Sequence, residues 1–168
     1  MGPMTLDGIR RVLLRDLASL AAQLAAYPDD ASLWREAPGI SNPGGTLALH
    51  LAGNLRHFVG AQLGGTAYVR DREAEFARRT RSRADLVAEV AAARADVEDT
   101  LRRLAPDDLA RAFPIPIGGA TLATEQVLVH LAGHLAYHLG QLDYHRRLVT
   151  GGGSVPGMQS PSALADGG

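Results

Sequence analysis

The chain has 168 residues, of which 17 are basic and 18 acidic, and its formal net charge is −1. This length suits one domain with a sizeable core, and the balanced charge gives no reason to expect nucleic acid or an anionic membrane as a partner. The sequence has no cysteine, which excludes disulfides, thiolate metal ligands and a cysteine nucleophile. No signal-peptide pattern or membrane-length apolar run is present. We therefore expect a soluble, cytoplasmic protein.

The first half of the chain predicts two helices, because apolar residues recur there at helical spacing. The first covers about residues 5–26 and ends at "YPDD". The second follows the loop "APGISNPGG", with Asn42 or Thr46 as its N-cap, and runs to about Leu63. The charged stretch "TAYVRDREAEFARRTR" comes next, and we predict a solvated connection with a partly helical piece.

Two more helices are predicted in the second half. Ser82 and Asp85 resemble a capping box that opens a helix over residues 83–104. In "FPIPIGGATLAT", two short apolar runs flank a glycine pair and predict a small hairpin. The last helix begins at Thr124 and reaches about Val149.

These elements predict an all-α fold, a four-helix bundle with a short β-hairpin before the last helix. The long second connection favours a crossover over simple up-and-down wiring. We assign residues 1–149 to the bundle domain. Residues 150–168 are rich in glycine, serine and proline, and we predict that this tail is disordered.

Four of the six histidines lie in "HLAGHLAYHLGQLDYH", residues 130–145. At about 100° per residue, five polar side chains of this helix share an arc about 80° wide beside the leucine face. They are His130, His134, His138, Gln141 and His145. Some of these imidazoles must therefore point toward the interior of the bundle.

The second predicted helix repeats this pattern in "LALHLAGNLRHFVG", where His50, Asn54 and His57 fall within about 60° of one another. A single histidine near an apolar face is usually a hydrogen-bonded core residue. Burying several without partners would cost several kcal/mol, and a metal would supply the missing partner. Histidines at i and i+4 reach one metal from a helix. The pattern favours a metal site, with structural or surface histidines as the alternative.

The segments "TLALHLAGNLRHFVG" and "EQVLVHLAGHLAYHLGQLDYH" resemble the DinB-like (YfiT-like) superfamily of small bacterial four-helix proteins. The resemblance is to an uncharacterised branch with "HLAGN" on its second helix, and it extends from the first helix to about Leu148. It implies a divalent metal held by His50 from the second helix and by His134 and His138 from the last. The sequence "HLGQ" has Leu139 where the family often has arginine, so any role of that arginine is missing here.

An all-nitrogen donor set suits zinc or nickel, and three protein ligands leave positions open, as in catalytic sites. Asn54 and Gln141, each about one turn after a ligand, are candidates to orient a ligand, a bound water or a substrate. Helix-to-helix hydrogen bonds are the alternative role for both. His130 matches a family histidine that is generally not a ligand, and the family assigns no role to His57 or His145. We keep His130 and His57 as candidates around the site.

Members of this family include thiol-dependent transferases and isomerases that use low-molecular-weight thiols such as mycothiol or bacillithiol. The resemblance implies a metal-dependent enzyme of this kind, or a hydrolase, acting on a small-molecule substrate. One alternative is a non-catalytic, metal-containing module that binds a small molecule or serves in stress responses, and another is a bundle without metal. The resemblance also implies a homodimer.

Overall fold

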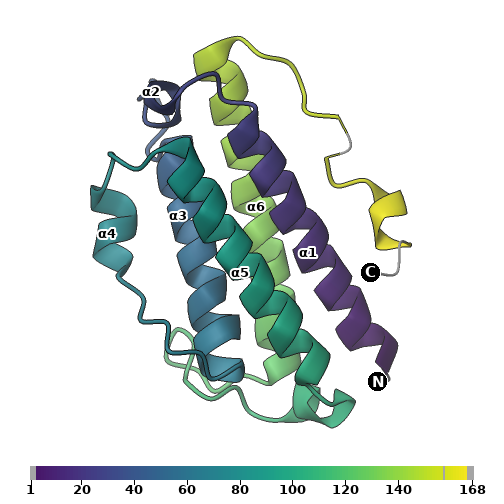
Figure 1. The fold of residues 1–168 in the computed structure, drawn as a ribbon. Coiled ribbons are helices and arrows are strands. Elements are labelled where there is room, and N and C mark those ends of the chain that lie inside the picture. Colours follow the sequence, from purple (N-terminus) through teal and green to yellow (C-terminus); the bar gives the residue numbers. More distant parts are fainter. Residues whose placement is uncertain (1–2, 157, 166–168) are drawn as a thin grey trace.

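The computed structural model describes residues 3–156 and 158–165, and four long helical segments make up most of this part (Figure 1). They are α1 (Pro3–Ala25), α3 (Gly44–Leu55) with its π-helical continuation η1 (Arg56–Leu63), α5 (Arg83–Arg103) and α6 (Thr124–Thr150). The shorter elements are α2 (Asp30–Leu33), α4 (Arg72–Ala77), and the 3-10 turns η2 (Pro106–Ala110) and η3 (Pro161–Leu164). The chain is thus mostly helical, as predicted.

The long helices lie side by side, with α1 packed on α5 and α6, and α3 packed on the same two helices. Helices α1 and α6 run in one direction and α3 and α5 in the other (Figure 1). The segment between η1 and α5 therefore joins two parallel helices, as a crossover connection must. Inward-facing leucines from all four segments form the core, among them Leu13, Leu51, Leu101 and Leu135.

Local signals in the sequence explain several helix ends. Ser82 and Asp85 form the predicted capping box at the start of α5. Helix α6 ends at Thr150 and is capped by Gly151, whose φ of 68° is left-handed and suits glycine. Helix α3 instead begins at Gly44, with Pro43 as its N-cap and no capping side chain from Asn42 or Thr46. The N–H of Gly44, the first residue of α3, instead donates to Nδ1 of His145 on α6.

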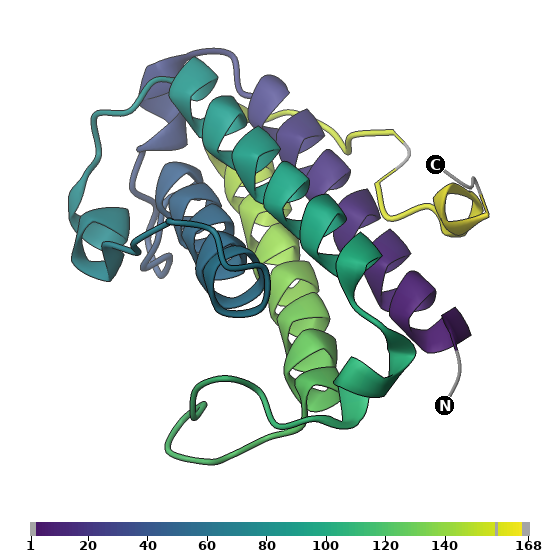
Figure 2. The same ribbon diagram turned by 60° about the horizontal axis from the view of Figure 1, so that its bottom comes forward.

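The predicted hairpin is only partly formed. The chain reverses between residues 111 and 124 at the end of the bundle where α6 begins (Figure 2). Isolated bridges join Ala112 to Ala123 and Ile117 to Ala120, but no strand is assigned in the described residues. Two prolines, Pro114 and Pro116, lack the N–H that a longer ladder would need.

The tail beyond α6, for which we predict disorder, runs back along α1 in the structure (Figure 1). Gln159 makes hydrogen bonds with Ser19 and Asp16, and Arg11 donates to the Leu164 carbonyl. Polar side chains of α1 thus face amide and carbonyl groups of the tail. Disorder of residues 150–168 stays a prediction.

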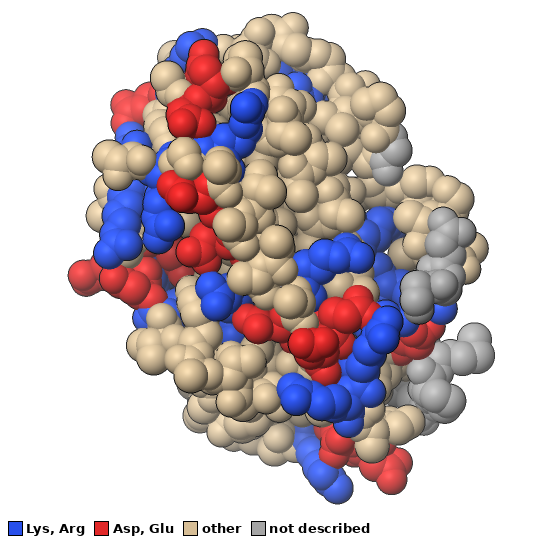
Figure 3. Space-filling view, in the orientation of Figure 1, with Lys and Arg blue, Asp and Glu red and all other residues tan. Residues whose placement is uncertain are grey.

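Acidic and basic side chains are interspersed on the face shown in Figure 3, without a large area of one sign. Many charged side chains of the described residues are paired, as Arg10 is with Asp7 and Glu98. Among the described residues, no helix combines the length and apolar character that crossing a membrane requires.

Candidate metal centre

The structure brings together three of the predicted site histidines, His50 from α3 and His134 and His138 from α6. One ring nitrogen from each lies within 4.8 Å of the other two. Nε2 of His50 is 3.2 Å from Nε2 of His134. The i, i+4 pair lies on α6 opposite His50, because α3 packs directly against α6.

The environment of His50 fixes the direction of its ring. Its Nδ1 lies 3.2 Å from Oε2 of Glu75, a buried residue of the short helix α4. Arg70 donates to both carboxylate oxygens at 2.7 Å. Burial alone would raise the pKa of Glu75, but hydrogen bonds from Arg70 and His50 outweigh it and lower this pKa below its ordinary value. Glu75 is therefore an ionised acceptor beside the Nδ1 of His50.

His138 also has its Nδ1 engaged, by Oε1 of Gln141 at 2.6 Å. Because a carbonyl oxygen only accepts, Nδ1 carries the proton and Nε2 keeps its lone pair. Burial lowers the pKa of His138, and the hydrogen bond with Gln141 partly opposes this. Both rings are thus held from the Nδ1 side with Nε2 left for a ligand, the usual arrangement around metal-binding histidines.

His134 completes the group but has no such support. Its Nδ1 is buried without a hydrogen-bond partner. Burial lowers the pKa of His134 to about 4, and the neighbouring rings of His138 and His50 add to the effect. The ring is neutral at neutral pH, which is the form that binds a metal. Three imidazoles make a donor set that fits zinc or nickel.

The remaining candidates surround this group without joining it. Asn54 is buried one turn after His50, and its Oδ1 has no hydrogen-bond partner. His130 is exposed, with its ring centroid 6.1 Å from that of His134. His57 packs against Phe58, and burial lowers its pKa, with smaller effects from the charges of Arg70 and Glu75. The chain is π-helical from Arg56 onward, so the angle of His57 about the helix axis differs from that of a helical wheel with 3.6 residues per turn.

His145 has a separate, structural position near the start of α3, where its ring is only 1% exposed. Its Nδ1 is 2.8 Å from the Tyr27 hydroxyl and accepts from the Gly44 N–H at 3.2 Å. Its Nε2 lies 2.9 Å from the carbonyl oxygen of Arg35. A backbone N–H can only donate and a carbonyl only accept, so the proton is on Nε2. The imidazole caps α3 from another helix.

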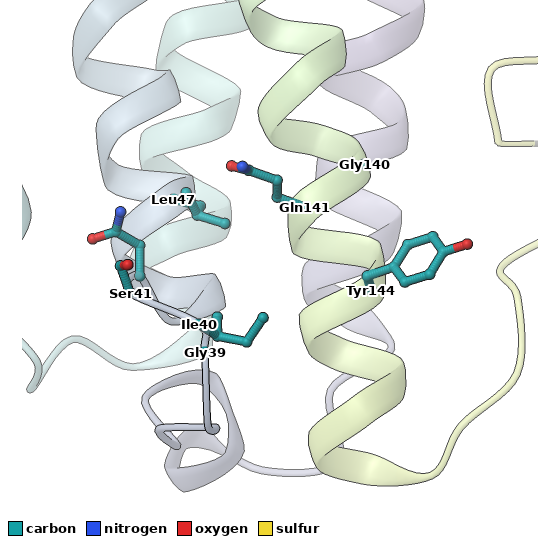
Figure 4. Close-up of a pocket in the computed structure, with 8 residues that line it drawn as sticks. Gly39, Ile40, Ser41, Leu47, Gly140, Gln141 and Tyr144 are labelled. Atoms are coloured by element: carbon teal, nitrogen blue, oxygen red, sulfur yellow. The ribbon is translucent and has the colours of Figure 1, made fainter.

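A cavity of about 430 Å³ lies between the N-terminal part of α3 and α6 (Figure 4), and it is linked to the histidine group through Gln141. Gln141 points from α6 toward α3 and lines this cavity with the amide that also holds His138 (Figure 4). No charged side chain is among the lining residues, which include Ile40, Ser41, Asn42, Leu47 and Tyr144. The cavity therefore suits a small molecule with apolar and neutral polar groups.

Sequence reasoning missed Arg70 and Glu75. Both lie in the charged stretch predicted to be a solvated connection. Only the fold shows that α4 packs on α3 and buries this ion pair against His50. Nothing in the spacing distinguishes Glu75 from its exposed neighbour Glu73. The single available signal was Gly53, a glycine inside a helix one turn from a candidate ligand.

Comparison with known proteins supports the family resemblance seen in the sequence. The family model of the DinB superfamily matches residues 10–142, which include all three grouped histidines. No curated protein matches the chain significantly. The match covers most of the chain, from α1 to the last turns of α6. The chain therefore belongs to the DinB superfamily.

Proposed function

We propose that His50, His134 and His138 hold one divalent metal ion, zinc or nickel. The observation that carries this proposal is the approach of three ring nitrogens to within 4.8 Å of one another. In two of the three rings, those of His50 and His138, Nδ1 contacts another side chain. This leaves Nε2 as the nitrogen that can bind the metal. Without a metal, the Nε2 atoms of His50 and His134, 3.2 Å apart, need a proton on one of them to form a hydrogen bond.

We further propose that the centre belongs to a metal-dependent enzyme, a thiol-dependent transferase or isomerase, or a hydrolase. A divalent metal with open positions supplies Lewis acidity that lowers the pKa of a thiol or water. Because the chain has no cysteine, the thiol must be a separate small molecule such as mycothiol or bacillithiol. Gln141 would hold His138 and present its amide to a substrate in the adjacent cavity.

A non-catalytic module that binds a small molecule at the metal is the second candidate. One observation favours it: Glu75, the carboxylate nearest the group, is fully engaged by Arg70 and His50 and so is not free to act as a general base. A screen of thiol-dependent reactions separates the two candidates, since only the enzyme turns over.

We also propose that the chain forms a homodimer through α6. Large apolar side chains stand exposed along this helix at helical spacing, with Tyr137 65% and Tyr144 71% exposed. Val129 and Leu148 extend the same strip, and Gly133 and Gly140 lie within it with open space beside them. Multi-angle light scattering of the full chain tests this proposal.

Cobalt substitution tests the metal function. We expect the visible spectrum of the cobalt protein to change on addition of benzyl mercaptan, with release of a proton near neutral pH. His138→Ala should abolish the cobalt spectrum, and His130→Ala, an exposed histidine of the same helix, should preserve it. A spectrum that ignores benzyl mercaptan, acetohydroxamate and azide would remove the enzyme proposal.

A further inference from the structure

Glu75 carries a charge that the fold buries almost completely, with only 6% of the residue exposed. A buried carboxylate is costly unless it is paired and hydrogen-bonded. Here Arg70 provides two hydrogen bonds at 2.7 Å, one to each oxygen. The third polar neighbour is Nδ1 of His50 at 3.2 Å. The ion pair is thus assembled directly against one predicted metal ligand.

Gly53 makes this approach possible. A Cβ atom built at Gly53 would lie 2.2 Å from Oε1 of Glu75, which is closer than real Cβ contacts come. The next nearest group, the hydroxyl of Tyr68 at 3.3 Å, would need only a small shift. The carboxylate therefore occupies the space that any side chain at position 53 would take. This accounts physically for a glycine, a poor helix former, inside "HLAGN".

We propose that Glu75 is a positioning residue, which accepts a hydrogen bond from the Nδ1–H of His50 and so directs Nε2 at His134 and His138. This inference rests on the proposed metal function and deepens it. Arg70 holds the carboxylate in place by the bidentate contact. Because Gly53 has no side chain, the carboxylate can lie against the backbone of α3 at this position.

Arg70 can only donate, and its Nη2 already donates to Oε2 of Glu75 at 2.7 Å, closer than the 3.2 Å between Nη2 and Nδ1 of His50. Nη2 would donate to Nδ1 only if that nitrogen were unprotonated, in the opposite tautomer of His50. That arrangement would place the Glu75 carboxylate against the lone pair of Nδ1. It would also put the proton on Nε2, the nitrogen that faces His134. With Nδ1 protonated, the anionic carboxylate receives the hydrogen and Arg70 remains satisfied by Glu75.

Zinc affinity of the full chain, measured by competition with a chromophoric chelator, tests the proposal. Glu75→Gln keeps the shape but removes the charge, and should weaken zinc binding by about 10–100-fold. Glu73→Gln is the matched control, since Glu73 is exposed on the same short helix, and should leave affinity unchanged. An affinity of Glu75→Gln within about twofold of the wild type would overturn the proposal.

A double-mutant cycle separates positioning from general packing. Gly53→Ala should weaken zinc binding in the wild type by displacing the carboxylate. In the Glu75→Ala background the same change should cost nothing further, because the space is then vacant. An equal loss in both backgrounds would mean that Gly53 acts independently of Glu75, which contradicts the proposal.

Nitrogen-15 NMR of the metal-free protein reports the His50 tautomer without any metal. We expect a protonated Nδ1 in the wild type and loss of this preference in Glu75→Ala. If the wild type binds no zinc but shows this tautomer, the metal function fails and the positioning contact stands. If it binds zinc while His50 carries its proton on Nε2 in the metal-free form, the positioning role is wrong and the metal function stands.

Discussion

Replacing His145 by alanine should destabilise the fold and leave the metal centre intact. The imidazole is buried and links α6 to the start of α3 and to the segments after α1 and α2, because it accepts from Tyr27 and Gly44 and donates to the Arg35 carbonyl. Tyr27 is fully buried, and a Cβ at Gly44 would lie 2.0 Å from its hydroxyl, so this region is tightly packed. His145 is not among the three grouped histidines.

The magnitude follows from the groups left without partners. The Tyr27 hydroxyl and the Gly44 N–H both lose a buried acceptor, at about 1–3 kcal/mol each, so the variant should lose about 4 kcal/mol of unfolding free energy. The Arg35 carbonyl belongs to an exposed residue and adds little, since water can replace the ring. For a chain of this size, such a loss lowers the melting temperature by about 10 °C.

Differential scanning calorimetry with parallel zinc titration measures both expectations. His145→Asn, whose amide oxygen can take the place of Nδ1 as acceptor, should lose less stability than His145→Ala. His130→Ala serves as the control, because His130 is exposed on the same helix. A His145→Ala melting temperature within about 2 °C of the wild type would refute the capping role. Loss of zinc binding with unchanged stability would show that His145 is a ligand.

Three further predictions follow from the site and the tail. His134→Ala or His138→Ala should each abolish tight zinc binding, while His130→Ala should retain it, as measured by chelator competition. The metal-free protein should lose stability as pH falls from 6.5 toward about 4. Burial lowers the pKa values of His134, His138 and His145, so the unfolded chain binds more protons than the folded protein in this range. Constant stability in urea denaturation at several pH values would contradict this. Deleting residues 151–168 should lower the melting temperature by a few degrees without changing zinc content, since the tail's hydrogen bonds in the described residues are with α1 and with the end of α6, including Arg146, and not with the three grouped histidines. An unchanged melting temperature would favour the disordered tail.

The histidine group was predictable because it depends on helical periodicity and on two helices that must face one core. The i, i+4 pair on α6 and His50 on α3 all lie within regular α-helix, where a wheel is reliable. His57 lies beyond Leu55, where the chain changes to a π-helix, so a wheel of 3.6 residues per turn does not give its direction reliably.

Glu75 shows a second limit of sequence reasoning. A charged stretch indicates exposure unless tertiary packing supplies partners, and the partners of Glu75 come from a loop and another helix. The deciding contacts therefore join residues that local patterns do not relate.

The most direct test of the metal centre is the metal content of the full chain purified without a histidine tag. Elemental analysis after incubation with zinc or nickel and removal of free ions should give about one equivalent per chain, because one group of three histidines is present in the described residues. The His134→Ala variant should give none. Less than about a tenth of an equivalent in the wild type would contradict the account.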